Sequence, residues 1–271
     1  MPKIKNKTKK TTIVASLLVG LLIVVFGYTT VGFNSSIDDF VFASLLVLII
    51  PITILTTIDY QWRTAIDEHL PDLFRSIVQA QEVGMTLPQA LEEASKRDYG
   101  PLTKELQKMT VQMSWGSSFE EALIAFENRV GTVLTQRTIP MIIEASRSGG
   151  RAEQVFDPLR KFIETTNILE KERKTQTRPY IAIIYVALFV FIFTIIILFN
   201  TFFTDIEGVA LFSMSTSSPL VLHRIFLHLT IVQGFFSGLV AGKMGEGSIN
   251  SGLKHSVIMM LIGYLALRFF L

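Results

Sequence analysis

Long apolar stretches lie on both sides of a charged segment, and they constrain the fold of this chain more than any other feature. The first stretch, residues 13–33, contains 21 residues without a charge. About 20 apolar residues are enough for a helix to cross the hydrocarbon core of a bilayer. With 49% hydrophobic residues and a mean hydropathy of +0.45, the chain is too apolar for an ordinary soluble domain. We predict an all-α, polytopic protein of the cell (cytoplasmic) membrane.

Four further stretches bring the number of predicted transmembrane helices to about five. They are residues 40–58, 180–203, 222–242 and 256–271. Pro51 can kink the first of these without ending it, and the last is short. A cleaved signal peptide is the alternative for residues 13–33. Its apolar region would have only about 7–15 residues and a small-residue cleavage site would follow, so a membrane anchor is favoured.

Basic residues decide the predicted orientation, because cytoplasmic loops carry an excess of Lys and Arg. Five lysines lie within the first ten residues, and 16 of the 25 bases lie in residues 59–180. On the opposite side the bases Arg224 and Arg268 lie only at helix ends. We therefore expect the N-terminus and residues 59–179 in the cytoplasm and the C-terminus outside. The predicted domains are a basic tail with two membrane helices (1–58), a cytoplasmic helical bundle (59–179) and three membrane helices (180–271).

One eight-residue pattern occurs twice in the charged segment, at residues 84–91 and 116–123. In each copy a glycine suits the left-handed position that ends a helix. A hydroxyl residue two places later suits the N-cap of the next helix, and Gln or Glu follows three places after it, as in a capping box. The pattern predicts repeated helix hairpins. The predicted turn residues are Gly84, Thr86, Gly116 and Ser118, with a further turn at Gly149 and Gly150.

Apolar residues at helical spacing predict a bundle of about six helices, each with one stripe turned inward. The second to fourth helices are expected at about 87–96, from Pro101, and from Phe119 to Val130. The fifth, 132–147, either bends at Pro140 or begins at Thr138. The first stripe is Ile66, Leu70, Leu73 and Ile77, and the sixth, in a helix that continues into the span at 180, is Phe156, Leu159, Ile163 and Leu169.

No constellation of catalytic or metal-binding residues emerges, so we predict no enzyme activity and no cofactor. The chain has no cysteine, its four histidines are scattered, and it lacks Gly-x-Ser-x-Gly and His-Glu-x-x-His motifs. Residues 238–244 are similar to a phosphate-binding loop, but Met244 stands where Ser or Thr should bind magnesium. We interpret His228 in the fourth span as a polar group satisfied by a neighbouring helix rather than as a proton relay.

Two patterns concern the membrane. Small residues spaced by four allow two membrane helices to approach closely, and the fourth span has them at Gly234, Gly238 and Gly242. Bases beside a span attract anionic headgroups by about 1 kcal/mol each, and they occur at Lys171, Arg173, Lys174 and Arg178. We interpret the basic run as a topology signal and lipid anchor, with a contact for a cytoplasmic partner as the alternative.

Taken in order, these motifs resemble the F family of type II secretion and type IV pilus systems, which are polytopic membrane platform proteins. The resemblance covers about residues 70–178. It rests on Leu70-Pro71-Asp72, on the two repeat copies, and on Glu144 followed by Gly149-Gly150. Residues 242–256 are similar to the archaeal branch, whose members assemble archaella and related pili, and tight-adherence platform proteins are similar in size. Many members carry two cytoplasmic bundles, whereas this chain has one.

The resemblance implies a non-enzymatic protein that binds a hexameric secretion ATPase in the cytoplasm and passes its movements to pilin-like subunits. It also implies pairing with itself or with a sister platform protein, and we expect no nucleic-acid partner. The expected ATPase-docking residues are Glu144, Arg147 and Arg151. A solvated helix end is the alternative for these three. The alternative function is a membrane subunit of an ATPase-coupled transporter, which the neighbouring genes would distinguish.

Overall fold

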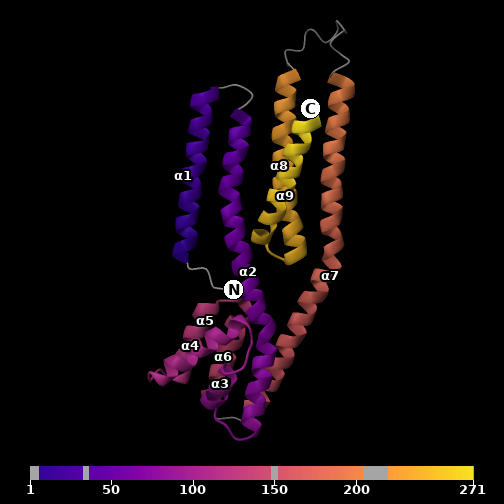
Figure 1. Ribbon diagram of the computed structural model, residues 1–271. Coiled ribbons are helices and arrows are strands. Elements are labelled where there is room, and N and C mark those ends of the chain that lie inside the picture. Colours follow the sequence, from indigo (N-terminus) through magenta and orange to yellow (C-terminus); the bar gives the residue numbers. More distant parts are fainter. Residues whose placement is uncertain (1–5, 33–36, 148–151, 204–218, 271) are drawn as a thin grey trace. The chain divides into compact units, whose positions relative to one another are not determined.

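The computed structural model describes residues 6–32, 37–147, 152–203 and 219–270, and every regular element in these ranges is a helix (Figure 1). The predicted all-α fold is therefore confirmed over the described part of the chain. The helices are α1 (Asn6–Val31), α2 (Ile37–Glu82), α3 (Leu87–Ser95), α4 (Pro101–Ser114), α5 (Phe119–Val130), α6 (Val133–Arg147), α7 (Ala152–Leu198), the π-helix η1 (Phe199–Phe203), α8 (Pro219–Glu246) and α9 (Ile249–Phe270).

The chain forms two compact units: unit 1 comprises residues 58–173, and unit 2 comprises residues 4–57 and 174–271. Among the described residues, α1, α2, α7, α8 and α9 are long and apolar enough to cross a membrane. This agrees with the five predicted spans. The fifth was expected to be short, but α9 already begins at Ile249 and has 22 residues. At 1.5 Å per residue it is about 33 Å long, which is sufficient for a bilayer core.

Unit 1 packs the apolar faces of its helices into one core. The predicted stripe of α2 is buried from Ile66 to Ile77. The helix α6 runs through Pro140 without a break, with Ile139 and Ile142 in the core, so the alternative start at Thr138 was wrong. The buried residues of α3, α4, α5 and α7 include Leu91, Leu102, Leu106, Met109, Leu123, Phe126, Leu159 and Ile163.

One predicted core residue of α7 was wrong. Leu169 is 59% exposed, although Ile163 on the same helix is fully buried. Six residues correspond to about 600° of rotation at 3.6 residues per turn, so Leu169 lies on a different face from Ile163. The side chain that faces α2 at this level is Asn167, which donates a hydrogen bond to the backbone oxygen of Asp67. The side chain of Phe156 lies outside the described residues.

Close approach at small residues holds α8 against α9 in unit 2. A Cβ atom added to Gly238 would lie 2.1 Å from the backbone nitrogen of Ser256, and one added to Gly242 would lie 2.0 Å from Cα of Gly252. Gly234 lies on the same face, against the α9 backbone at Met259. The glycine face of α8 is thus covered by α9 of the same chain. Residues 238–244 are part of the continuous helix α8, which rules out a phosphate-binding loop there.

Ion pairs join the first residues of α2 to the last two helices of unit 2. Arg224 donates two hydrogen bonds to the carboxylate of Asp38, at 2.7 and 3.0 Å. Asp39 accepts hydrogen bonds from Tyr264 at 2.6 Å and from Arg268 at 3.2 Å. The two bases that the sequence places at external helix ends are therefore both paired with acids of α2.

His228 lies beside the same cluster. Its Nε2 atom is 3.5 Å from Oδ1 of Asp38, so its polar neighbour comes from another helix, as we interpreted it. The side chain is nevertheless 54% exposed rather than buried.

Candidate functional site

The two copies of the repeat fold into the same helix-ending motif. At the first copy, Gly84 N–H donates to the oxygen of Gln81, and Met85 N–H donates to that of Ala80. The second copy repeats this pair of bonds, from Gly116 to Met113 and from Ser117 to Gln112. These are the two hydrogen bonds of a Schellman motif, which requires a left-handed residue at the glycine position. Gly84 has φ +88° and Gly116 has φ +97°, so both copies meet this requirement.

The next helix begins directly after each motif. Glu121 N–H donates to Oγ of Ser118 at 3.2 Å, and Ser118 N–H donates to the Glu121 carboxylate at 2.9 Å, which forms the expected capping box. In the first copy, Thr86 N–H donates to Oε1 of Gln89 at 3.0 Å. The four turn residues named from the sequence therefore occupy the predicted cap and turn positions.

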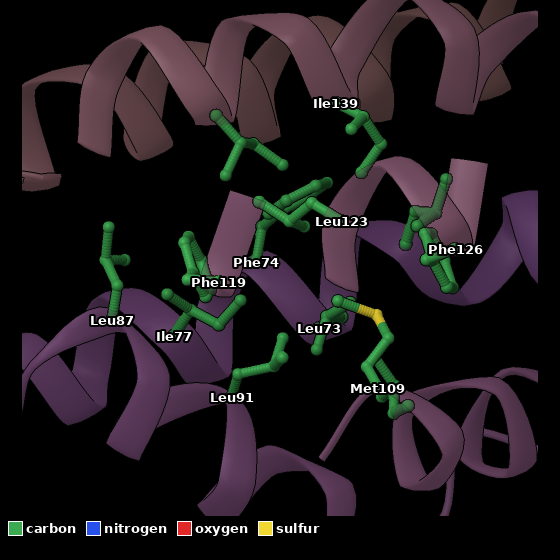
Figure 2. Close-up of a pocket in the computed structure, with 13 residues that line it drawn as sticks. Leu73, Phe74, Ile77, Leu87, Leu91, Met109, Phe119, Leu123, Phe126 and Ile139 are labelled. Carbon is green, nitrogen blue, oxygen red and sulfur yellow. The ribbon is translucent and has the colours of Figure 1, made fainter. Parts of the chain in front are cut away.

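A shared cavity places the two turns at the same end of unit 1. Leu87 and Phe119, the first residues of α3 and α5, both line a cavity of about 20 Å³ in the core. Figure 2 shows their side chains close to Ile77 of α2. All thirteen lining residues are apolar, so the cavity offers a water molecule no hydrogen-bond partner. It is a packing defect of the core rather than a binding site.

A bidentate ion pair brings the end of α6 to the same place. Arg147 donates hydrogen bonds of 2.9 and 2.6 Å to the two carboxylate oxygens of Glu120 at the start of α5. These hydrogen bonds hold the pKa of Glu120 below its ordinary value. Glu144 is exposed one turn before Arg147. The other predicted residues of this end, Gly149, Gly150 and Arg151, lie outside the described residues.

We call the region formed by residues 82–87, 114–121 and 144–147 the turn surface. It exposes two large apolar side chains that the sequence pattern alone did not single out: Val83 is 75% exposed and Trp115 is 84% exposed. Each directly precedes the glycine of its motif. The sequence could have identified Val83 and Trp115, because both hold the position before the glycine. The motif does not require an apolar residue at that position.

A partly buried carboxyl group, that of Asp67, lies elsewhere in unit 1, between α2, the α5–α6 connection and α7. Oγ1 of Thr132 donates a 2.7 Å hydrogen bond to Oδ1 of Asp67. Burial, together with the negative charge of nearby Glu170, raises the pKa of Asp67 to about 6, although the Thr132 hydrogen bond opposes the rise. Asp67 therefore changes its protonation near neutral pH. It was not among the residues predicted from the sequence, because Thr132 is 65 positions away.

The predicted basic run lies along α7. Lys171, Lys174 and Arg178 are spaced by three and four residues, so they share one side of the helix. Arg173 is exposed on another side. These four bases give this part of α7 a positively charged surface.

Unit 2 contains an apolar groove of about 610 Å³ between α1 and α2 on one side and α8 and α9 on the other. Its lining includes Leu45, Ile49, Phe235 and Met260. The hydroxyl of Ser44 already donates a hydrogen bond to the backbone oxygen of Gly20. The groove therefore suits an apolar occupant that brings no hydrogen-bonding group. Among the described residues, no group of three or more His, Asp or Glu side chains is placed to hold a metal ion.

Comparison with known proteins finds a family match over part of the chain. Residues 73–199 match the family described as "Type II secretion system (T2SS), protein F". An uncharacterized protein of Methanocaldococcus jannaschii is 24% identical over 237 residues, which are 86% of this chain and 38% of that protein. The chain thus spans well under half the length of this curated relative. No solved structure matches the chain significantly.

Replacing either turn glycine by valine should destabilise unit 1. A left-handed backbone costs a residue with a side chain about 1–2 kcal/mol, and a β-branched residue tolerates it least. We expect Gly84→Val and Gly116→Val each to lower the melting temperature of the full-length protein in detergent. Met85→Val and Ser117→Val are matched controls, because these neighbours do not have positive φ. Equal melting temperatures for all four variants would show that the turns do not depend on glycine.

Acidification to pH 5 should stabilise unit 1 through Asp67. The pKa of Asp67 in the folded state, about 6, lies above its ordinary value of 3.8. The folded state therefore binds the proton more tightly, and this contribution is lost as the pH rises through 6. From pH 7.5 to pH 5 the gain is about 1 kcal/mol.

The measurement is unfolding of the full-length Trp115→Phe variant, in which fluorescence reports the buried Trp62 on the same helix. Asp67→Asn should remove most of the pH difference, whereas Asp72→Asn, at an exposed position of α2, should retain it. An unchanged pH dependence in Asp67→Asn would contradict the assignment.

Proposed function

We propose that this chain couples a cytoplasmic secretion ATPase to the insertion of pilin-like subunits, because residues 73–199 match the type II secretion system F family. Members of this family are membrane platform proteins of secretion and pilus-type machines rather than enzymes. The five apolar helices make this chain a multi-pass membrane protein. The filament that it serves would be a type IV pilus or an archaellum.

The observation that carries the proposal is the helical continuity of α2 and α7. Each contains an apolar segment long enough to cross the membrane, and each continues as a helix into residues of unit 1. A helix keeps its length when it is loaded, because every turn is closed by backbone hydrogen bonds. We propose that these two helices carry the movements of the ATPase from unit 1 to the membrane.

Unit 1 is proposed as the side that receives the ATPase. It has an apolar core and a turn surface built from rigid motifs. On this surface Arg147 contacts Glu120 beside the second hairpin turn, and Glu144 lies one turn before Arg147 on α6. The ion pair between Arg147 and Glu120 fixes the position of both charged groups. Arg151 is proposed for the same surface from its place in the sequence.

Unit 2 is proposed as the side that receives pilin-like subunits. Such a subunit must leave the bilayer as an apolar helix, and the groove between α2 and α8 offers apolar side chains without an unsatisfied polar group. The basic residues of α7 would hold the cytoplasmic face against anionic lipid. Pairing with a second copy or with a sister platform protein would have to use a face other than the glycines of α8, because α9 covers them.

We propose that the N-terminus and unit 1 face the cytoplasm and that α9 ends outside. The chain lacks cysteine, so single-cysteine variants report topology without a background. In intact cells, a membrane-impermeant maleimide should label Phe269→Cys, whose parent side chain is 82% exposed, and should leave Val83→Cys unlabelled until the membrane is permeabilised. Labelling of Val83→Cys in intact cells would overturn the topology.

Affinity purification of the full-length protein should recover the secretion ATPase encoded by its host, together with prepilins. We expect the double variant Glu144→Ala, Arg147→Ala to recover less ATPase than the unmodified protein. The matched control is Glu93→Ala, Lys96→Ala, which removes an exposed ion pair of 2.8 Å from α3. Equal losses in both variants would place docking elsewhere, and recovery of a solute-binding protein in place of prepilins would support a transporter.

A further inference from the structure

Val83 and Trp115 occupy the same position of two identical motifs, and the fold does not require an apolar side chain there. Each is the last residue before the left-handed glycine. The backbone of Trp115 is relaxed, at φ −88° and ψ 5°, which any residue can adopt. Both side chains leave the core and are among the most exposed large apolar groups of unit 1. An exposed Trp beside a rigid turn has the residue type and the position of an interface anchor.

The residue ranges that make up the turn surface carry a net negative charge. The turn surface holds four acids, Glu82, Glu120, Glu121 and Glu144, and one base, Arg147, which is a net charge of 1 − 4 = −3 over its described residues. Arg147 is already bonded to Glu120. Apolar anchors on a negatively charged surface match a partner surface that presents an apolar pocket bordered by Lys or Arg.

We propose that Trp115 is the anchor by which the turn surface docks into an apolar, basic-rimmed pocket of the secretion ATPase, with Val83 as a weaker second contact. This inference rests on the proposed function and deepens it, because it names the residue that makes the contact and the chemistry of the surface that receives it. Trp is enriched among the few interface residues that carry most of the binding energy.

The charge of the turn surface argues against two other occupants. Anionic headgroups attract basic segments and repel acidic ones, so a membrane surface would not receive Trp115. A second copy of this chain, meeting the same surface through two-fold symmetry, would bring acids against acids. A basic protein partner satisfies both the charge and the exposed indole.

The chain contains two tryptophans, and they differ in a way that permits a direct test. Trp62 is 3% exposed in the core of unit 1, and Trp115 is 84% exposed. Full-length protein in detergent, with fluorinated tryptophan in this chain only, should give one ¹⁹F resonance for each residue. Trp115→Phe identifies the exposed one. Addition of the purified ATPase should shift the Trp115 resonance and protect it from solvent, while the Trp62 resonance stays in place.

Binding affinities provide the second arm. We expect Trp115→Ala to weaken ATPase binding at least tenfold, Val83→Ala to weaken it less, and Trp115→Phe to retain most of it. Val133→Ala, which truncates an exposed valine at the other end of α6 from Arg147, should bind as the unmodified protein does. An unmoved Trp62 resonance in Trp115→Ala shows that the variant is folded.

The outcomes separate this inference from the proposed function. If the ATPase binds and Trp115 neither shifts nor matters for affinity, docking occurs elsewhere, and only the anchor is overturned. If the unmodified protein does not bind the ATPase at all, the proposed function fails and the anchor fails with it. A Trp115 shift caused by anionic vesicles alone, or by raising the concentration of this chain alone, would assign the surface to lipid or to a second copy and would overturn the inference.

Discussion

Backbone hydrogen bonding inside the bilayer is the constraint on which the rest of this structure depends. The hydrocarbon core holds no water to pair with N–H and C=O groups, and a helix pairs them all within one segment. The helices α2 and α7 meet this constraint and extend beyond it, since each has more than twice the residues that a span needs. Two of the core helices of unit 1, α2 and α7, are therefore continuations of helices that also contain a membrane segment.

Within unit 1 the stability comes from apolar packing, while the shape comes from its turns. Two Schellman motifs end α2 and α4 in the same way, and the residues after them, Leu87 and Phe119, enter the same part of the core. Such turns are short and leave little freedom, which suits the proposed role of this surface in transmitting movement. The polar contacts that join distant segments, from Thr132 to Asp67 and from Arg147 to Glu120, then fix the helices against one another.

The two units divide the proposed work by their chemistry. Unit 1 presents charge, turn motifs and an exposed indole, which are the features of a protein-docking surface. Unit 2 presents a groove of about 610 Å³ with apolar walls, and its small residues are spent on packing α8 against α9. In the proposed function, the first set of features serves contact with the ATPase and the second serves contact with apolar helices of pilin-like subunits.

The sequence by itself determined the helices, because the signals that start and stop a helix lie within a few residues of its ends. Gly84, Gly116 and the capping box at Ser118 show this, as do the apolar stripes of α2 and α5. Only the tertiary structure decided which faces meet. It paired the α8 glycines with α9, turned Leu169 outward, placed Asp67 against Thr132 and left Trp115 exposed. These contacts join residues far apart in the chain, so they depend on how whole helices dock and not on local hydrogen bonding.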